Sequence, residues 1–179
     1  MKFKLVVDSC CELTPELKEE PLNAVSVPLS MTVGNETFID DENLDIDAFI
    51  EKMNNYSDKT ISSCPSPQAF VDEFEKDETN FVVTLSSQLS GSNSSANIAK
   101  NIANEDGTQV HVFDSKSASA GELLIALKIK ELVEKKLDKN SIINTVEEFI
   151  KNMKTFFVLD NLDNLRKNGR MSKLTVKLT

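Results

Sequence analysis

The feature of this chain that most restricts its fold is the alternation of short apolar runs with segments of helical periodicity. The apolar runs are typical of strands, and each is followed by a segment whose apolar residues recur at helical spacing. The run at 80–85 is almost wholly apolar, as expected for a strand buried on both faces of a parallel sheet. Strands are predicted at 2–7 (KFKLVV), 80–85 (NFVVTL), 109–113 (QVHVF) and 155–159 (TFFVL). The order predicts an α/β protein with a parallel sheet flanked by helices.

The segments between these strands carry helix-start signals. Thr14 can cap a helix and Pro15 suits its first turn, and Ser141 is expected to cap another. Helices are predicted at 15–20, 45–53, 67–74, 94–103, 121–136 and from 141 onward. Residues 24–33 are expected to be extended, with Pro28 marking an edge or a bend. The turn Gly34-Asn35 and a strand at 37–39 complete a predicted hairpin, and 57–67 is expected to be a loop.

Charge and composition argue against several classes of protein. The net charge of −9 argues against nucleic-acid binding, which needs a basic surface. No run approaches the roughly 20 apolar residues of a membrane span, and the start of the chain does not resemble a signal peptide, so a cytoplasmic protein is expected. Three cysteines do not suggest a disulfide framework, and with His111 as the single histidine no metal site is expected.

Three predicted loops are rich in serine. They contain Ser62-Ser63-Cys64, Ser86 to Ser92, and Ser115 to Ser119. Ligands of parallel α/β sheets lie at the carboxyl ends of the strands, and serine hydroxyls with free amides at a helix start suit a carboxylate or phosphate. Serines also cap helices and fill turns without any ligand. Both interpretations stay open at this point.

Two enzyme classes can be weighed on the same loops. A hydrolase or transferase using Ser87, Ser90 or Cys64 would need a base, and His111 falls inside a predicted strand. The SQLSG segment is not the G-x-S-x-G nucleophile elbow. Neither G-x-G-x-x-G nor the phosphate-binding loop G-x-x-x-x-G-K-[ST] occurs. These observations favour a binding protein, with the hydrolase as the alternative.

Six segments, taken in order, resemble the DegV family of bacterial fatty-acid-binding proteins. They are 4–17 (KLVVDSCCELTPEL), 25–40 (VSVPLSMTVGNETFID), 62–75 (SSCPSPQAFVDEFE), 84–96 (TLSSQLSGSNSSA), 112–124 (VFDSKSASAGELL) and 162–173 (LDNLRKNGRMSK). The resemblance implies a carrier, not an enzyme, that holds a long-chain fatty acid with its tail in an apolar tunnel. It also implies a partner, a fatty acid kinase that phosphorylates the bound carboxylate. No cofactor is implied.

The resemblance also suggests site residues. Ser62 and Ser63 match one family loop, Ser87 and Ser90 a second, and all four are expected to bind the carboxylate. Arg170 matches the arginine of the family's G-G-R motif and is expected near the head group or on the kinase-docking surface. Cys64 departs from the usual glutamine, and Asn168 from the first glycine of G-G-R.

Family members continue into a second α/β domain. The resemblance therefore predicts an N-terminal domain at 1–154 and the start of a second, truncated domain at 155–179. It also predicts an exposed apolar face, rimmed by the serine loops, on this stretch of chain.

Overall fold

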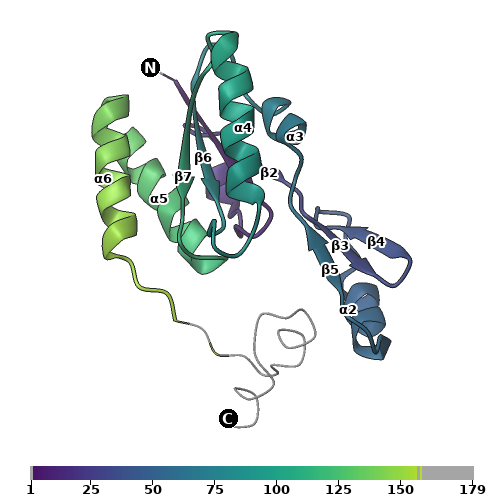
Figure 1. Cartoon of the computed structure of the whole chain (residues 1–179). Helices are drawn as coiled ribbons and strands as arrows, with labels where there is room; N and C mark the ends of the chain where they lie inside the picture. Colours follow the sequence, from purple (N-terminus) through teal and green to yellow (C-terminus); the bar gives the residue numbers. More distant parts are fainter. Residues whose placement is uncertain (1, 157, 159–179) are drawn as a thin grey trace. The chain divides into compact units, whose positions relative to one another are not determined.

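The computed structural model describes residues 2–156 and 158 and divides them into two compact units. Among the described residues, the first unit contains 2–29 and 64–155, and the second contains 30–63, 156 and 158. Figure 1 shows the elements of each unit. The loops of interest at the carboxyl ends of the parallel strands belong to the first unit.

The first unit contains a four-stranded parallel sheet. Its strands are β1 (Phe3–Asp8), β2 (Val25–Val27), β6 (Thr79–Thr84) and β7 (Gln109–Asp114), in the order β2-β1-β6-β7. The central strands β1 and β6 pair in register, with Val6 opposite Val82, and every residue of β6 is buried. The predicted parallel sheet flanked by helices is confirmed, and its strands all end at one edge.

Helices cover both faces of this sheet (Figure 1). Helices α5 (Ala120–Glu134) and α6 (Lys139–Asn152) pack on one apolar cluster, and α3 (Pro67–Val71) and α4 (Ser92–Glu105) on another. A short helix, α1 (Pro15–Lys18), adds Leu17 to the first cluster. Since successive side chains of a strand point to opposite faces, Leu5 and Val7 enter the first cluster and Val6 the second.

Aromatic rings fill the first cluster. Phe81 lies at the centre of the sheet, with its ring 5.3 Å from that of Phe3 and 5.7 Å from that of Phe113. All three side chains are buried, and full burial of one such side chain stabilises the fold by about 1.5–3 kcal/mol. The core of the first unit therefore depends on residues from three neighbouring strands.

Three helix starts differ from the prediction. Thr14 precedes α1, but its hydroxyl makes no cap hydrogen bond among the described residues, and α4 begins at Ser92, two residues before the predicted start. The third is α6. Asp138, not Ser141, caps this helix, because its carboxylate accepts from the amides of Asn140 and Ser141 at 3.0 and 3.1 Å. Ser141 lies inside the helix and donates its hydroxyl to Asp138 at 2.5 Å. The carboxylate accepts all three donors, so it replaces the serine as the cap.

The second unit is a small antiparallel sheet with one helix. Strands β3 (Ser30–Val33), β4 (Glu36–Ile39) and β5 (Ile61–Ser63) lie in the order β4-β3-β5, and α2 spans Ile46–Asn55. The hairpin predicted around Gly34 is confirmed, and this glycine has the positive φ of 64° that the turn requires. Phe38 of β4 meets Phe49 of α2 at 5.2 Å, edge to face.

Two predicted segments differ from the structure in this region. Residues 24–33 form two strands, β2 and β3, which belong to different sheets and are separated by Pro28 and Leu29. The loop predicted at 57–67 is interrupted by β5, which pairs with β3 through Ser62 opposite Met31. The polar composition of β5 does not predict a strand, and its pairing with β3 at the edge of the sheet stabilises it.

The predicted strand at 155–159 is not formed by its described residues, Thr155, Phe156 and Val158. The division into domains at 1–154 and 155–179 stays a prediction, since most of the later segment lies outside the described residues. Among the helices of the described part, none combines the length and the apolar character needed to cross a membrane.

Candidate functional site

The loop between β6 and α4 is a compact turn. The amides of Leu89 and Ser90 donate to the carbonyl of Ser86 at 2.8 and 3.1 Å, and the amide of Gln88 donates to the Ser86 hydroxyl at 3.3 Å. We call residues 86–91 the serine loop. It leads directly into α4, whose first-turn amides have no earlier carbonyl partner inside the helix.

Two aspartates, at the ends of the two strands that flank β6, hold the serine loop. Asp8, the last residue of β1, accepts from the amide of Leu85 at 2.9 Å and from the hydroxyl of Ser92 at 2.6 Å. Asp114, the last residue of β7, accepts from the amide and the hydroxyl of Ser87 at 3.0 and 2.6 Å. The order β1-β6-β7 places one carboxylate on each side of the strand that carries the loop.

The two predicted serines of this loop have different hydrogen bonds. The hydroxyl of Ser87 donates to Asp114. Burial raises the pKa of Asp114, but hydrogen bonds from Ser87 and Lys116 outweigh it and hold that pKa below its usual range. The Ser90 hydroxyl instead accepts from the amide of Ser92 at 3.1 Å. Among the described residues no hydrogen bond uses the Ser90 hydroxyl as a donor to an acceptor, so its hydrogen is available to a ligand.

The serines after β7 have mainly structural contacts. Ser115 and Ser117 are buried, and the Ser115 hydroxyl accepts from the Ser117 amide and donates to the Ser117 carbonyl. The Ser117 hydroxyl meets that of Thr155 at 2.8 Å. A Cβ on Gly121 would lie 2.0 Å from the Ser117 Oγ, so only a glycine fits at this position of α5 without a shift of the Ser117 side chain. For this loop, the interpretation that serines fill turns describes the structure.

Ser62 and Ser63 lie on β5 in the second unit, where both are exposed. The next residue, Cys64, belongs to the first unit, and its Sγ lies 3.8 Å from the Ser95 Oγ. A Cβ added at Gly91 would lie 3.0 Å from this sulfur. The four predicted serines are therefore divided between the units, two in each. Arg170 lies outside the described residues.

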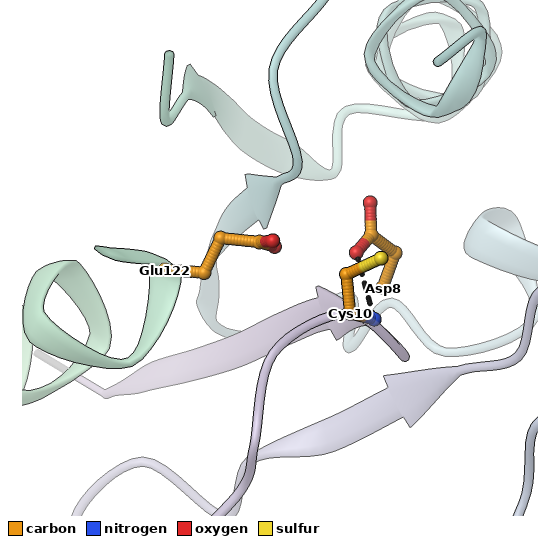
Figure 2. Close-up of side chains that lie close together, drawn as sticks. All are labelled: Asp8, Cys10 and Glu122. Atoms are coloured by element: carbon orange, nitrogen blue, oxygen red, sulfur yellow. Dashed lines mark hydrogen bonds between the residues drawn. The ribbon is translucent and has the colours of Figure 1, made fainter. Parts of the chain in front are cut away.

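A buried acidic pair, which the sequence analysis missed, lies beneath this edge of the sheet. Figure 2 shows Glu122, from α5, directed toward Asp8, with Cys10 beside Asp8. Burial, and next the Asp8 charge, raise the pKa of Glu122 to about 10, so it carries a proton at neutral pH. The S-x-x-E pattern from Ser119 to Glu122 was the available signal, because it predicts a capping box at a helix start.

The same three side chains could approach a cation. One ligand atom each from Asp8, Cys10 and Glu122 lies within 4.8 Å of the others. However, the Asp8 oxygens already accept from three protein donors, the amides of Cys10 and Leu85 and the hydroxyl of Ser92. The arrangement therefore fits a carboxyl and carboxylate pair better than a metal centre.

The histidine that a hydrolase would need as a base is not hydrogen-bonded to a candidate nucleophile in the described part of the chain. His111 lies within β7 against Phe113, with ring centroids 4.5 Å apart, and 3.6 Å from Glu147 of α6. Burial is the main cause that lowers its pKa. In the described part of the chain no hydrogen bond joins His111 to Ser87, Ser90 or Cys64. Cys11 is buried, and burial raises its pKa to about 12, so its thiol is a poor nucleophile at neutral pH.

A parallel sheet with a donor-bearing loop at its carboxyl edge, leading into a helix, defines an α/β protein with a polar site at a strand-to-helix turn. The chain belongs to the DegV family: the family model, described as an uncharacterised protein of the DegV family, matches residues 2–178. A DegV domain-containing protein of Streptococcus pneumoniae strain R6 is 39% identical over 178 residues, which cover 97% of this chain and 63% of that protein.

Solved structures share the fold. The Streptococcus pneumoniae Fatty Acid Kinase (Fak) B3 protein, loaded with linoleic acid, has a TM-score of 0.92 and 37% identity over 100% of this chain and 65% of its own. A DegV-family protein of Ruminococcus gnavus, with vaccenic acid, has a TM-score of 0.88 and 39% identity over 95% and 62%. One of Eubacterium eligens, loaded with heptadecanoic acid, has a TM-score of 0.89 and 28% identity over 98% and 63%. The chain thus spans less than two thirds of the length of these relatives.

Proposed function

We propose that this chain binds a long-chain fatty acid and acts as a carrier of it. The observation that carries the proposal is the likeness to the Streptococcus pneumoniae protein loaded with linoleic acid, which extends over 100% of this chain at a TM-score of 0.92. Two further structural relatives hold fatty acids of similar kind. A ligand with one carboxylate and a long apolar tail suits a site that offers neutral donors.

The Ser90 hydroxyl is the donor in the first unit that best fits the carboxylate. Its oxygen is held by the Ser92 amide while its hydrogen remains available, and α4 begins beside it with its positive dipole end. Ser87 would have to exchange its bond to Asp114 for one to the ligand, so its role is secondary. Ser62 and Ser63 belong to the other unit and stay predicted contributors, as does Arg170.

Neutral donors are a suitable way to hold this ligand. A carboxylate moved out of water is costly unless several hydrogen bonds replace its hydration. The tail supplies the larger favourable term, about 0.8 kcal/mol for each buried CH₂ group. The head group therefore determines the orientation and the preference for an acid, and the tail determines most of the affinity.

The carrier role includes a partner. We propose that a fatty acid kinase acts on the presented carboxylate, in the cytoplasm, and that this chain binds and presents the acid without converting it. The position of His111 in β7, against Phe113 and Glu147, supports a role in binding, because among the described residues no hydrogen bond joins it to Ser87, Ser90 or Cys64.

Two measurements test the proposal on the 179-residue chain. Mass spectrometry of solvent extracts is expected to find fatty acids in the purified protein. After delipidation, radiolabelled linoleic acid should bind, and linoleyl alcohol should compete less well. Ser90→Ala should weaken binding of the acid about tenfold and of the alcohol much less, since one hydrogen bond to a charged group contributes roughly 1.5–3 kcal/mol.

Ser141→Ala is the matched control, because it removes a serine hydroxyl from the first turn of another helix. Ser62→Ala, Ser63→Ala and Ser87→Ala measure the remaining predicted serine contacts in the same assay. A chain that takes up no acid, or that binds acid and alcohol equally before and after Ser90→Ala, would contradict carboxylate recognition.

A further inference from the structure

A single oxygen atom connects the two ends of the serine loop. The Asp8 Oδ2 accepts from the amide of Leu85, the residue just before the loop, and from the hydroxyl of Ser92, the residue just after it. The second oxygen, Oδ1, accepts from the amide of Cys10 at 3.2 Å. The two loop ends are 77 and 84 positions from Asp8 in the sequence, so only the fold brings them together.

The connection continues from Asp8 to Ser90. Ser92 donates its hydroxyl to Asp8 and its amide to the Ser90 oxygen. Ser92 and Asp8 are both fully buried, so water does not replace these bonds easily. The Ser90 oxygen is thereby used as an acceptor, and its hydrogen is directed away from Ser92.

We propose that Asp8 is a positioning residue that fixes both ends of the serine loop and thereby orients the Ser90 hydroxyl toward an acid ligand. This inference rests on the proposed function, because it assigns Asp8 a role in that same site. Asp8 itself does not bind the ligand. An ionised carboxylate suits the role since it offers only acceptors, and all three of its partners are donors.

Asp8→Asn is the sharpest test, because the amide has the same shape but only one acceptor oxygen. If that oxygen takes the Oδ2 place, the new NH₂ group faces the Cys10 amide; if it takes the Oδ1 place, NH₂ faces Leu85 and Ser92. Either way a donor loses its acceptor. We expect binding of linoleic acid to weaken about tenfold and that of linoleyl alcohol by less than about twofold.

Asp138→Asn is the matched control. Asp138 also accepts from two amides and one serine hydroxyl, but at the start of α6, whose Lys139 contacts Gln109 at the opposite end of β7. This variant should change neither affinity. Ser92→Ala is a second, milder variant, which removes the hydroxyl donor alone. It should show the same acid-specific loss, and it keeps the test possible if Asp8→Asn does not fold.

The double variant, Asp8→Asn with Ser92→Ala, distinguishes a positioning role from general destabilisation of the fold. If Asp8 acts through Ser92, the combined loss for the acid will be smaller than the product of the two single losses. Hydrogen exchange of the Leu85 amide gives a readout without ligand, and it should become faster in Asp8→Ala, which removes both acceptor oxygens, but not in Asp138→Asn.

The outcomes distinguish this inference from the proposed function. A wild-type chain that binds no acid overturns the proposed function and with it the ligand-orienting role. Unchanged exchange at Leu85 in Asp8→Ala overturns the fixing of the loop, whatever the binding assay shows. A wild-type chain that binds acid, with equal losses for acid and alcohol in Asp8→Asn and in Ser92→Ala, overturns the positioning role alone.

Discussion

The buried acidic pair makes the stability of the first unit depend on pH, and Glu122→Gln should remove most of that dependence. The Glu122 side chain is fully buried, faces Asp8 and accepts from the Ser119 amide at 3.2 Å. Since its folded pKa is about 10, the folded form carries a proton that a glutamine amide replaces without a change of shape. The amide oxygen can still accept from the Ser119 amide, and the NH₂ group takes the place of Oε2, which has no hydrogen-bond partner among the described residues.

Proton linkage gives the direction in which the stability of the first unit changes with pH. Glu122 has an ordinary pKa of 4.5, and the fold raises it to about 10, so the folded chain binds more protons than the unfolded chain between these values. The contribution of Glu122 to the free energy of unfolding is fully present below pH 4.5 and is lost as pH rises toward 10. Each unit within that window lowers the free energy of unfolding by about 1.4 kcal/mol, or about 3 kcal/mol from pH 6 to pH 8.

Urea denaturation at pH 6 and pH 8, followed by far-UV circular dichroism, measures this difference. The far-UV signal reports mainly the first unit, because the long helices α4, α5 and α6 belong to it, whereas α2 belongs to the second. The wild-type midpoint should fall by at least about 1 M urea. Glu122→Gln should show a much smaller fall and greater stability at pH 8. Glu105→Gln, an exposed change on α4, is the control, and equal falls for wild type and Glu122→Gln would refute the reasoning.

Three further predictions concern the same unit. Phe81→Ala should lower the free energy of unfolding by about 3–5 kcal/mol in urea denaturation, because a ring packed between two others is lost; a loss under about 1 kcal/mol would contradict the central place of Phe81. Gly121→Ala should cost about 1–3 kcal/mol, because its Cβ would meet the Ser117 side chain at 2.0–2.5 Å, and adding Ser117→Gly should recover part of this in the same assay. Cys11, with its pKa raised to about 12, should be alkylated by iodoacetamide at pH 7.5 only on unfolding, which peptide mass spectrometry can check; labelling as fast as that of Cys64 would count against it.

The local pattern of side chains was enough to predict most elements of the first unit. The apolar run at 80–85 and the helical spacing after 120 correspond to β6 and α5, because a strand or helix buried on a known face has a characteristic period. The serine loop was also visible in the sequence, since serine and glycine at a strand end favour a turn. The sequence did not show that Pro28 separates strands of two sheets, because both halves are locally extended.

The amino-acid sequence alone determined the alternating strands and helices, the parallel sheet and the serines that precede α4. Only the tertiary structure decided which of these serines can donate a hydrogen bond to a ligand. The Ser87 hydroxyl already donates to Asp114, whereas the Ser90 hydroxyl accepts from Ser92 and keeps its hydrogen available. The tertiary structure also decided that Asp8 and Glu122 share a buried space. Such partners lie far apart in the chain, and hydrogen bonds and pKa values depend on the strand order and burial that bring them together.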